Sequence, residues 1–367
     1  VGYYIPMMAG SRVAYSRSVK ELPEDLAMIR PTVLVSVPRI YERVYAKVWA
    51  KLEQEGALAR FLLRKAVQIG WEHFEARQGR LAHIGLLHRL SWPLLRKLVA
   101  DKILARLGGR LRIAVSGGAP LAERIGQFFL GLGVPLLQGY GLTEAAPVVS
   151  GNLLEANEPA SVGKPLPGIE LAFGDMDELL VRSDSIMLGY WQREQATQQA
   201  IDKDGWLHTG DVAEMRNEYL YIRGRLKEII VTSTGEKAAP ADLELAITLD
   251  PLFEQAMVVG EGRPFLGALV VLQPAAWQSL AADLGLDPAA PASLQEPAVT
   301  EVVLQKLAGA LHAFPGWAQV HAVYLTLEPW TIENGLLTPT MKLKRAQLQD
   351  RFAAPIEKLY AGHAVTG

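Results

Sequence analysis

LRIAVSGGAPLAERIGQFFLGLGVPLLQGYG, residues Leu111–Gly141, contains two short apolar runs with a longer segment between them. The runs Arg110–Gly118 and Val134–Gly141 have the length and composition of buried strands. Between them, Leu121–Gly133 has apolar residues at helical spacing. A strand, a helix and a second strand in this order are typical of a parallel pair, because parallel strands need a long crossover. The segment therefore predicts an α/β fold with a parallel sheet.

The segments around this unit divide the chain into three expected parts. Pro31–Ile40 has the pattern of a further buried strand, and a helical pattern follows it. From Ser161 to about Arg223 the pattern changes to short strands separated by Gly, Asn and Asp turns, which is typical of a β-rich subdomain. Strands and helices alternate after that. We expect a large α/β portion over 1–160, a β-rich subdomain over 161–226 and a small α+β domain over 227–367.

The composition excludes several classes of chemistry. Half of the 367 residues are hydrophobic, and the formal net charge is -2. Cysteine is absent, which excludes thiol nucleophiles, disulfides and cysteine-ligated metals, and fits a cytoplasmic protein. No apolar run has the length that a membrane-spanning helix needs.

The charge is unevenly distributed along the chain. Residues 57–112 contain 12 Lys or Arg and three acidic residues, a net of +9, so the remainder carries -11. Leu, Ile and Trp recur in this stretch at helical spacing. Two interpretations stay open: solvated amphipathic helices, or a face over residues 57–109 that meets an anionic membrane or ligand. Because aromatic residues for base stacking are not interleaved, nucleic-acid binding is not expected.

Two glycine clusters follow the two strands of the Leu111–Gly141 unit. Ser116–Pro120 ends the first strand, and Gly139–Glu144 ends the second. Ligands of parallel α/β sheets bind at these strand ends, and glycine lets the backbone come close to another group. In the second cluster, Thr143 and Glu144 could together hold a phosphate and its Mg²⁺. Each cluster taken alone is also compatible with an ordinary turn.

Two later segments add charged candidates. Asp211 follows Thr-Gly in a β context, where its carboxylate could accept both hydroxyls of a ribose, and Arg225 could pair with the ribose or with phosphates. Lys342 follows a Pro-Thr turn in NGLLTPTMKLKR (Asn334–Arg345), where its cation could offset charge that develops on a phosphoryl or acyl oxygen. Each of these charges, taken alone, could equally be an ordinary surface group.

Taken together and in this order, the motifs resemble the adenylate-forming (AMP-binding) superfamily, and within it the long-chain fatty-acid–CoA ligases. The resemblance rests on PTVLVSVPRIYERVYAKV (Pro31–Val48), QGYGLTEAAPVVS (Gln138–Ser150), DGWLHTGD (Asp204–Asp211), GRLKEIIVTSTGEKAAP (Gly224–Pro240) and NGLLTPTMKLKR. It implies an enzyme that makes acyl-AMP from a long-chain fatty acid and Mg·ATP, and then transfers the acyl group to CoA. It also implies a partial adenylation domain followed by a small C-terminal domain that rotates between the two half-reactions.

The resemblance also implies roles for individual residues. The nucleotide would be bound by Gly118, Ala119, Gly139, Tyr140, Gly141, Thr143, Asp211, Ile222 and Arg225. Lys342, Glu144 and Thr143 would be catalytic, with Glu144 also the Mg²⁺ ligand. Lys227 would be the hinge, and Ser233, Thr234, Gly235 and Glu236 would flank the pantetheine arm of CoA.

The sequence departs from the family at its N-terminal side. The Ser/Thr/Gly-rich phosphate loop that ends in Pro-Lys-Gly has no counterpart here. We therefore expect a chain without the N-terminal portion of the large domain, and we expect Tyr3, Tyr4, Ile5 and Met7 to be buried. Two alternatives stay open. One is an acyl-AMP or acyl-carrier-protein ligase, and the other is a nucleotide-binding fragment that is inactive without the loop.

Overall fold

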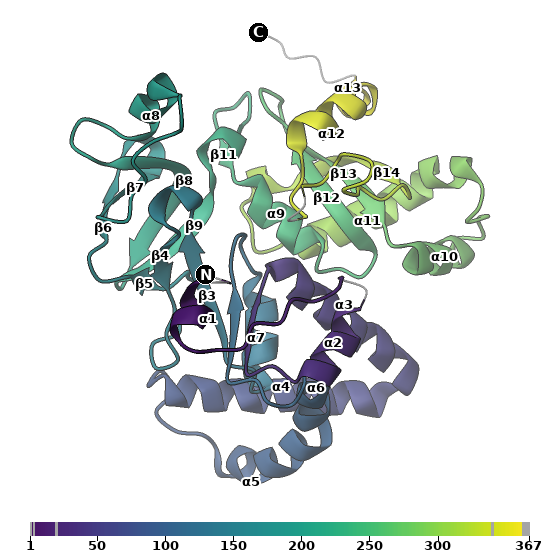
Figure 1. Cartoon of the computed structure of the whole chain (residues 1–367). Helices are drawn as coiled ribbons and strands as arrows, with labels where there is room; N and C mark the ends of the chain where they lie inside the picture. Colours follow the sequence, from purple (N-terminus) through teal and green to yellow (C-terminus); the bar gives the residue numbers. More distant parts are fainter. Residues whose placement is uncertain (1, 3, 19–20, 339–340, 362–367) are drawn as a thin grey trace. The chain divides into compact units, whose positions relative to one another are not determined.

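The computed structural model describes residues 2, 4–18, 21–338 and 341–361. The chain divides into two compact units, Val1–Ile222 and Arg223–Gly367, and the division falls within strand β9 (Figure 1). Each unit is described by itself below. The expected position of Tyr3 lies outside the described residues.

The first unit is built on a five-stranded sheet in the order β1-β2-β3-β4-β5. Its strands are β1 (Val33–Ser36), β2 (Ile113–Ser116), β3 (Leu136–Gly141), β4 (Val148–Gly151) and β5 (Lys164–Pro165). The first three strands run parallel, with Val33 opposite Ile113 and Ala114 opposite Leu136, whereas β4 and β5 are antiparallel additions. The parallel sheet predicted from Leu111–Gly141 is therefore confirmed.

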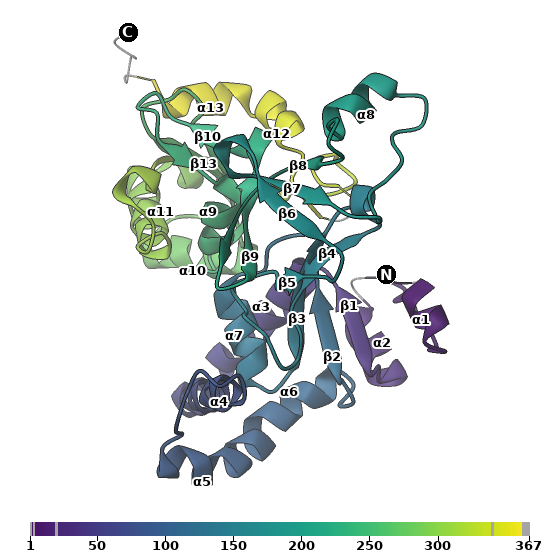
Figure 2. The same cartoon turned by 90° about the vertical axis from the view of Figure 1, so that its left-hand side faces the viewer.

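Two helices cover one face of this sheet, α3 (Pro38–Glu55) and α7 (Glu123–Gly131) (Figure 2). The Tyr41 hydroxyl of α3 donates to the Val115 carbonyl of β2 at 3.1 Å. The Tyr45 and Phe128 rings join the two helices edge to face, 4.9 Å apart. The expectation that β1 is a buried strand is wrong, because none of its four residues is buried and two of them are exposed. Because side chains alternate between the two faces of a strand, Val33 and Val35 point away from the buried face and are 49% and 52% exposed.

The basic stretch forms a helical layer next to α7. It consists of α4 (Ala57–Arg77), α5 (Leu86–Leu95), a π-helical turn (Arg96–Ala100) and α6 (Asp101–Arg106). α4 and α7 approach so closely that a β-carbon on Gly70 would lie 1.7 Å from the carbonyl oxygen of Gly131. Glycine at this crossing lets the two backbones touch.

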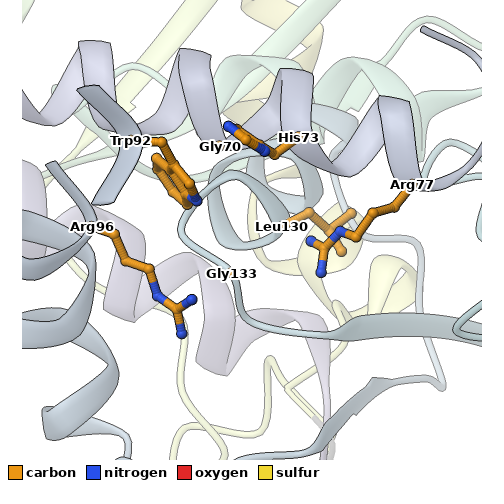
Figure 3. Close-up of a pocket in the computed structure, with 7 residues that line it drawn as sticks. All are labelled: Gly70, His73, Arg77, Trp92, Arg96, Leu130 and Gly133. Carbon is orange, nitrogen blue, oxygen red and sulfur yellow. The ribbon is translucent and has the colours of Figure 1, made fainter. Parts of the chain in front are cut away.

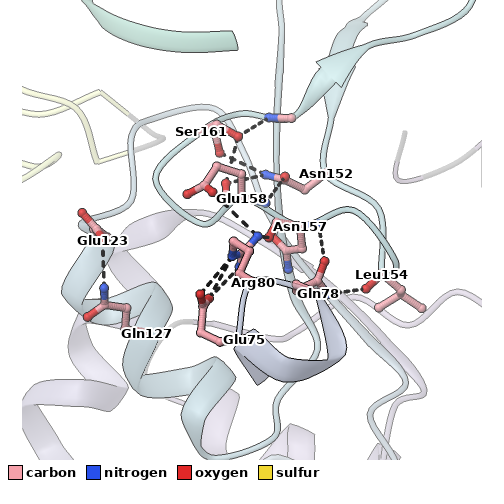
Figure 4. Close-up of polar contacts among 11 residues, drawn as sticks. Glu75, Gln78, Arg80, Glu123, Gln127, Asn152, Leu154, Asn157, Glu158 and Ser161 are labelled. Carbon is pink, nitrogen blue, oxygen red and sulfur yellow. Dashed lines mark hydrogen bonds and ion pairs between the residues drawn. The ribbon is translucent and has the colours of Figure 1, made fainter. Parts of the chain in front are cut away.

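A polar brace fastens the loop after β4 to the end of α4 (Figure 4). Gln78 donates to the Leu154 carbonyl and accepts from the Asn157 amide, both at 2.9 Å. The Arg80 guanidinium binds the Asn157 carbonyl at 3.0 Å and the Glu75 carboxylate at 2.7 Å. The side chains of Gln78 and Arg80 thereby form hydrogen bonds with backbone groups of a loop that is not part of a sheet.

The remainder of the first unit contains an antiparallel sheet in the order β6-β7-β8-β9. Its strands are β6 (Glu170–Phe173), β7 (Glu178–Arg182), β8 (Leu207–Arg216) and β9 (Tyr219–Arg225), and α8 (Glu194–Ala200) lies between β7 and β8 in sequence. Leu179, Val181, Leu207 and Leu220 form its fully buried core. At the other end of the unit are α1 (Tyr4–Met8) and α2 (Leu22–Ile29). The expected burial of Tyr4, Ile5 and Met7 is wrong, because α1 has no buried residue and these three side chains are 55–68% exposed.

The second unit is an α+β domain around the sheet β12-β13-β14, where β12 is antiparallel and β14 parallel to β13. The strands are β12 (Phe253–Val259), β13 (Leu266–Leu272) and β14 (Val320–Thr326). Every residue of β13 is buried, because one face packs with α9, α10 and α11 and the other with Trp330 and α12. The helices are α9 (Pro240–Ile247), α10 (Pro274–Asp283), α11 (Pro297–Ala310), α12 (Arg345–Arg351) and α13 (Ala353–Leu359).

Candidate active site

The C-terminal ends of β2 and β3 lie side by side and carry the two glycine clusters. Ser116 pairs with Gln138, and a β-carbon on Gly117 would lie 3.7 Å from the Gly139 carbonyl oxygen. Gly118 has φ +84°, which explains why glycine stands there, and Ala119 after it is exposed. The Ser116 hydroxyl is buried and has no hydrogen-bond partner among the described residues. The first glycine cluster therefore contains an unused donor, to which the sequence analysis assigned no role.

The glycines of β3 are required by the protein's own backbone. A β-carbon on Gly141 would lie 1.9 Å from the Pro147 carbonyl oxygen, and one on Gly139 would lie 3.2 Å from that of Ser150. Both carbonyls belong to β4 or to the turn before it. The glycines at these two positions therefore allow the backbone of β3 to lie close to the backbone of β4 and its turn. The Gly-Tyr-Gly sequence thereby lets the chain reverse tightly and places Tyr140 between two small residues.

Tyr140 connects the glycine clusters to the β-rich sheet. Its hydroxyl donates to Oδ2 of Asp211 at 2.5 Å, across 71 positions of sequence. Asp211 lies on β8 and is 5% exposed, and its amide donates to the Thr209 hydroxyl at 3.0 Å. Ile222 on β9 and Tyr140 pack against the same apolar core. The structure therefore brings together Tyr140, Asp211 and Ile222 from three strands.

Thr143 and Glu144 form a short 3₁₀ turn directly after β3 (Thr143–Ala145). Oε1 of Glu144 accepts a hydrogen bond from the Tyr190 hydroxyl at 2.9 Å, and this bond raises the pKa of Tyr190. Sequence reasoning missed Tyr190, although an aromatic hydroxyl in the exposed GYW segment (Gly189–Trp191) was an available signal. Among the described residues, no group of three or more His, Asp or Glu could hold a metal. A Mg²⁺ ion at Glu144 would therefore need phosphate oxygens and water as further ligands.

The other predicted residues lie in the second unit. Arg225 ends β9 and Lys227 lies in the 3₁₀ turn Leu226–Glu228, and both are exposed. Ser233–Glu236 form the turn between β10 (Ile230–Val231) and β11 (Lys237–Ala238), where Gly235 has φ +83°. The Ser233 amide donates to the Arg263 carbonyl at 2.9 Å, which fixes this turn against the β12–β13 loop.

Lys342 is exposed on a narrow loop of the second unit. Its amide donates to the Thr338 hydroxyl at 3.0 Å, and its carbonyl accepts from the Thr338 amide at 2.9 Å. Residues 339–340, the Pro-Thr expected to form the turn, lie outside the described residues. Three positions later Arg345 binds the buried Glu244 of α9 through two nitrogens, at 2.8 and 2.7 Å. Arg345 Nε also approaches Glu228 at 3.3 Å, so one guanidinium links the Lys342 loop, α9 and the segment next to Lys227.

Comparisons with known proteins agree with this arrangement. A family model described as AMP-binding enzyme matches residues 1–191, and one described as AMP-binding enzyme C-terminal domain matches residues 227–364. The chain belongs to the AMP-binding enzyme family. Among its relatives is the long-chain-fatty-acid–CoA ligase FadD15 of Mycobacterium bovis, 37% identical over 95% of this chain and 58% of the relative. The peroxisomal long chain acyl-CoA synthetase 6 of Arabidopsis thaliana is 34% identical over 94% of the chain and 51% of the relative.

Solved structures give the same family. The A domain of a carboxylic acid reductase from Segniliparus rugosus, in complex with AMP and a co-purified carboxylic acid, superposes with a TM-score of 0.68 and 25% identity. The alignment covers 96% of this AMP-binding enzyme chain and 51% of that chain. The chain thus spans between about half and three fifths of the length of these relatives. The mixed α/β fold with a small C-terminal domain is confirmed.

Proposed function

We propose that this chain carries the nucleotide- and thioester-forming residues of a long-chain fatty-acid–CoA ligase, which activates the acid as acyl-AMP and transfers it to CoA. The observation that carries the proposal is the hydrogen bond between Tyr140 and Asp211. It joins two motifs that are far apart in sequence and places a buried carboxylate next to an aromatic ring at the end of a parallel strand. The relatives named as long-chain-fatty-acid–CoA ligases support the choice of acid and acceptor.

Each residue in the proposal has a physical task. Asp211 accepts hydrogen bonds from the two ribose hydroxyls, and its burial strengthens these bonds because little water competes. Glu144 and Thr143 face the phosphates. Mg²⁺ bound by Glu144 would supply positive charge against the phosphate oxygens.

The second unit supplies the groups that change between the half-reactions. Lys342, exposed on its loop, provides a cation for the charge that develops during adenylation. The Ser233–Glu236 turn flanks the thiol-bearing arm of CoA. Lys227 is the proposed hinge, because it lies in the short turn that follows β9 and precedes the small domain in sequence.

Calorimetric titration with AMP tests the nucleotide site. We expect the chain to bind AMP, and we expect Asp211→Ala to weaken binding at least tenfold because it removes a charged hydrogen-bond acceptor. Asp204→Ala is the matched control, because Asp204 is an exposed carboxylate on the turn before the same strand. Equal affinities for the two variants would contradict the role of Asp211.

A coupled assay tests the chemistry. The chain is incubated with palmitate, Mg·ATP and CoA, and loss of the free CoA thiol is followed. Thioester formation that disappears in Lys342→Ala supports the ligase. AMP binding without thioester formation favours the nucleotide-binding alternative, and acyl-AMP release without thioester favours a different acceptor.

We also propose that residues 57–109 contact an anionic membrane, where a long-chain fatty acid partitions. No described helix is both long and apolar enough to cross a bilayer. The support is the surplus of nine positive charges over 57–112 together with exposed apolar residues on α5. Sedimentation with anionic and with neutral vesicles measures this contact, and equal binding to both would contradict it.

A further inference from the structure

A cavity of about 200 Å³ lies within the basic helical layer, away from the candidate active-site residues. α4 contributes His73 and Arg77, α5 contributes Trp92, the π-helical turn contributes Arg96, and Leu130 closes the side toward α7 (Figure 3). The Trp92 indole stacks on the His73 ring, with centroids 5.4 Å apart. The lining is therefore an aromatic wall with two guanidinium groups and no carboxylate.

His73, which belongs to the aromatic wall of the cavity, has one polar atom without a partner in the part of the chain that the structure describes. Nε2 of His73 is buried and has no hydrogen-bond partner among the described residues. Because Nε2 has almost no accessible surface, a ligand in the cavity would contact the ring of His73 and not this atom. Burial lowers the pKa of His73, and the positive charge of Arg77 lowers it further, so the ring is neutral near pH 7. A neutral ring adds no charge to the wall, so the positive charge of the cavity lining comes from Arg77 and Arg96.

The chemistry of the lining selects the ligand. Guanidinium groups bind phosphate oxygens through paired hydrogen bonds, and phosphate is small enough to share two of them. Arg96 also approaches Asp101 at 3.4 Å, but Asp101 does not line the cavity. An anion with several acceptor oxygens, such as a phosphate monoester, can accept hydrogen bonds from both guanidinium groups of the lining, Arg77 and Arg96.

The source of the phosphate is indicated by the surface next to the cavity. Four leucines of α5, Leu86, Leu87, Leu90 and Leu94, are 62–81% exposed. Their spacing places them on one face of the helix, and Trp92 packs inward toward α4 from another face. We call these four residues the α5 ridge. An exposed leucine face flanked by arginines is the pattern of a helix that lies in a membrane interface, with its basic side chains at the level of the headgroup phosphates.

We propose that this cavity binds the phosphate of an anionic phospholipid through Arg77 and Arg96, while the α5 ridge is buried in the same bilayer leaflet. The proposal rests on the membrane contact proposed above and is independent of the ligase reaction. It predicts selectivity for phosphate over other negative charge, which a diffuse basic surface would not give.

The test compares two kinds of vesicle with equal surface potential. Both consist of phosphatidylcholine. In one the negative charge comes from phosphatidic acid, and in the other it comes from the carboxylate of cholesteryl hemisuccinate. The measured quantity is the ratio of the two partition coefficients of the whole chain, from sedimentation. General electrostatic attraction and any contact with the phosphodiester of phosphatidylcholine cancel in this ratio, whereas recognition of the phosphate monoester of phosphatidic acid does not. We expect a ratio of about ten for the unaltered chain, the value of one charged hydrogen bond.

Paired variants separate the cavity from its surroundings. Arg77→Gln with Arg96→Gln removes both guanidinium groups, and we expect the ratio to fall to about one. Lys97→Gln with Lys102→Gln removes the same charge from exposed positions outside the cavity lining and should leave the ratio unchanged. Circular dichroism confirms that both pairs are folded. A ratio near one for the unaltered chain, or an equal fall in both pairs, would overturn the proposal.

Inorganic phosphate distinguishes a lipid from a free ligand. If the ratio is unchanged in 10 mM inorganic phosphate, the lipid source is supported. If 10 mM inorganic phosphate brings the ratio to one, free phosphate occupies the cavity at least as well as the lipid does, and selection of the lipid as the ligand is overturned. Because no nucleotide or acyl substrate is present, a failure here is distinct from a failure of the ligase proposal.

Discussion

Replacing Gly141 with alanine tests why the strand that carries Tyr140 must end in glycine. A β-carbon at this position would lie 1.9 Å from the carbonyl oxygen of Pro147. Real contacts of this kind are seldom shorter than 3.4 Å, so one of the two backbones has to move by about 1.5 Å. A neighbouring flexible side chain could yield at little cost, but here the opposing atom belongs to the backbone of the turn before β4.

The size of the effect follows from two opposing terms. Forcing an extra methyl group into a filled space costs about 1–3 kcal/mol. Alanine also lowers the conformational entropy of the unfolded chain, which stabilises the folded state by about 0.4–1 kcal/mol. We therefore expect Gly141→Ala to lower the free energy of unfolding of the first unit by about 1–2 kcal/mol. The shift of the turn should also move Thr143 and Glu144 and weaken the binding of AMP.

Gly151→Ala is the matched control. Gly151 lies on the adjacent strand β4, opposite Gly139, and a β-carbon there would meet no atom within 4 Å. We expect this variant to be as stable as the unaltered chain or slightly more stable. Urea unfolding followed by circular dichroism and AMP titration would be measured for both. If Gly141→Ala proves at least as stable as Gly151→Ala, the strand-on-strand explanation of the Gly-Tyr-Gly sequence is refuted.

Three further predictions concern stability. Gly70→Ala should destabilise the first unit by at least 1 kcal/mol in urea unfolding, because its β-carbon would overlap the carbonyl of the crossing helix. Arg345→Met leaves the buried Glu244 without its charged partner and should cost about 3–5 kcal/mol, whereas Arg351→Met, which removes an exposed pair, should cost less than about 1 kcal/mol. Burial raises the pKa of Asp242 to about 6, so the folded state holds this proton more tightly than the unfolded chain does. The free energy of unfolding should therefore fall by up to about 3 kcal/mol as pH rises from about 4 to 6. Asp242→Asn should remove this contribution and leave that of other groups, such as Glu244, whose pKa is also raised by burial.

The sequence determined those parts of the molecule that depend on short-range pattern. The apolar runs and the helical spacing of Leu111–Gly141 specify a strand, a helix and a strand, and a crossover of that length makes the strands parallel. The turn at Ser233–Glu236 was visible because a hairpin is formed by neighbouring residues. Family motifs also identified the residues of the proposed nucleotide site, since these motifs are short and occur in a fixed order.

Only the tertiary structure decided which groups meet across long separations and what covers each apolar face. Tyr140 and Asp211 are 71 residues apart, and Glu144 and Tyr190 are 46 apart, so no local pattern couples them. The sequence showed an apolar face on Val33–Ser36 and on α5, but not that Val33, Val35 and the α5 ridge are exposed. Periodicity gives the direction of a side chain relative to its own backbone, whereas burial depends on which other segment packs there.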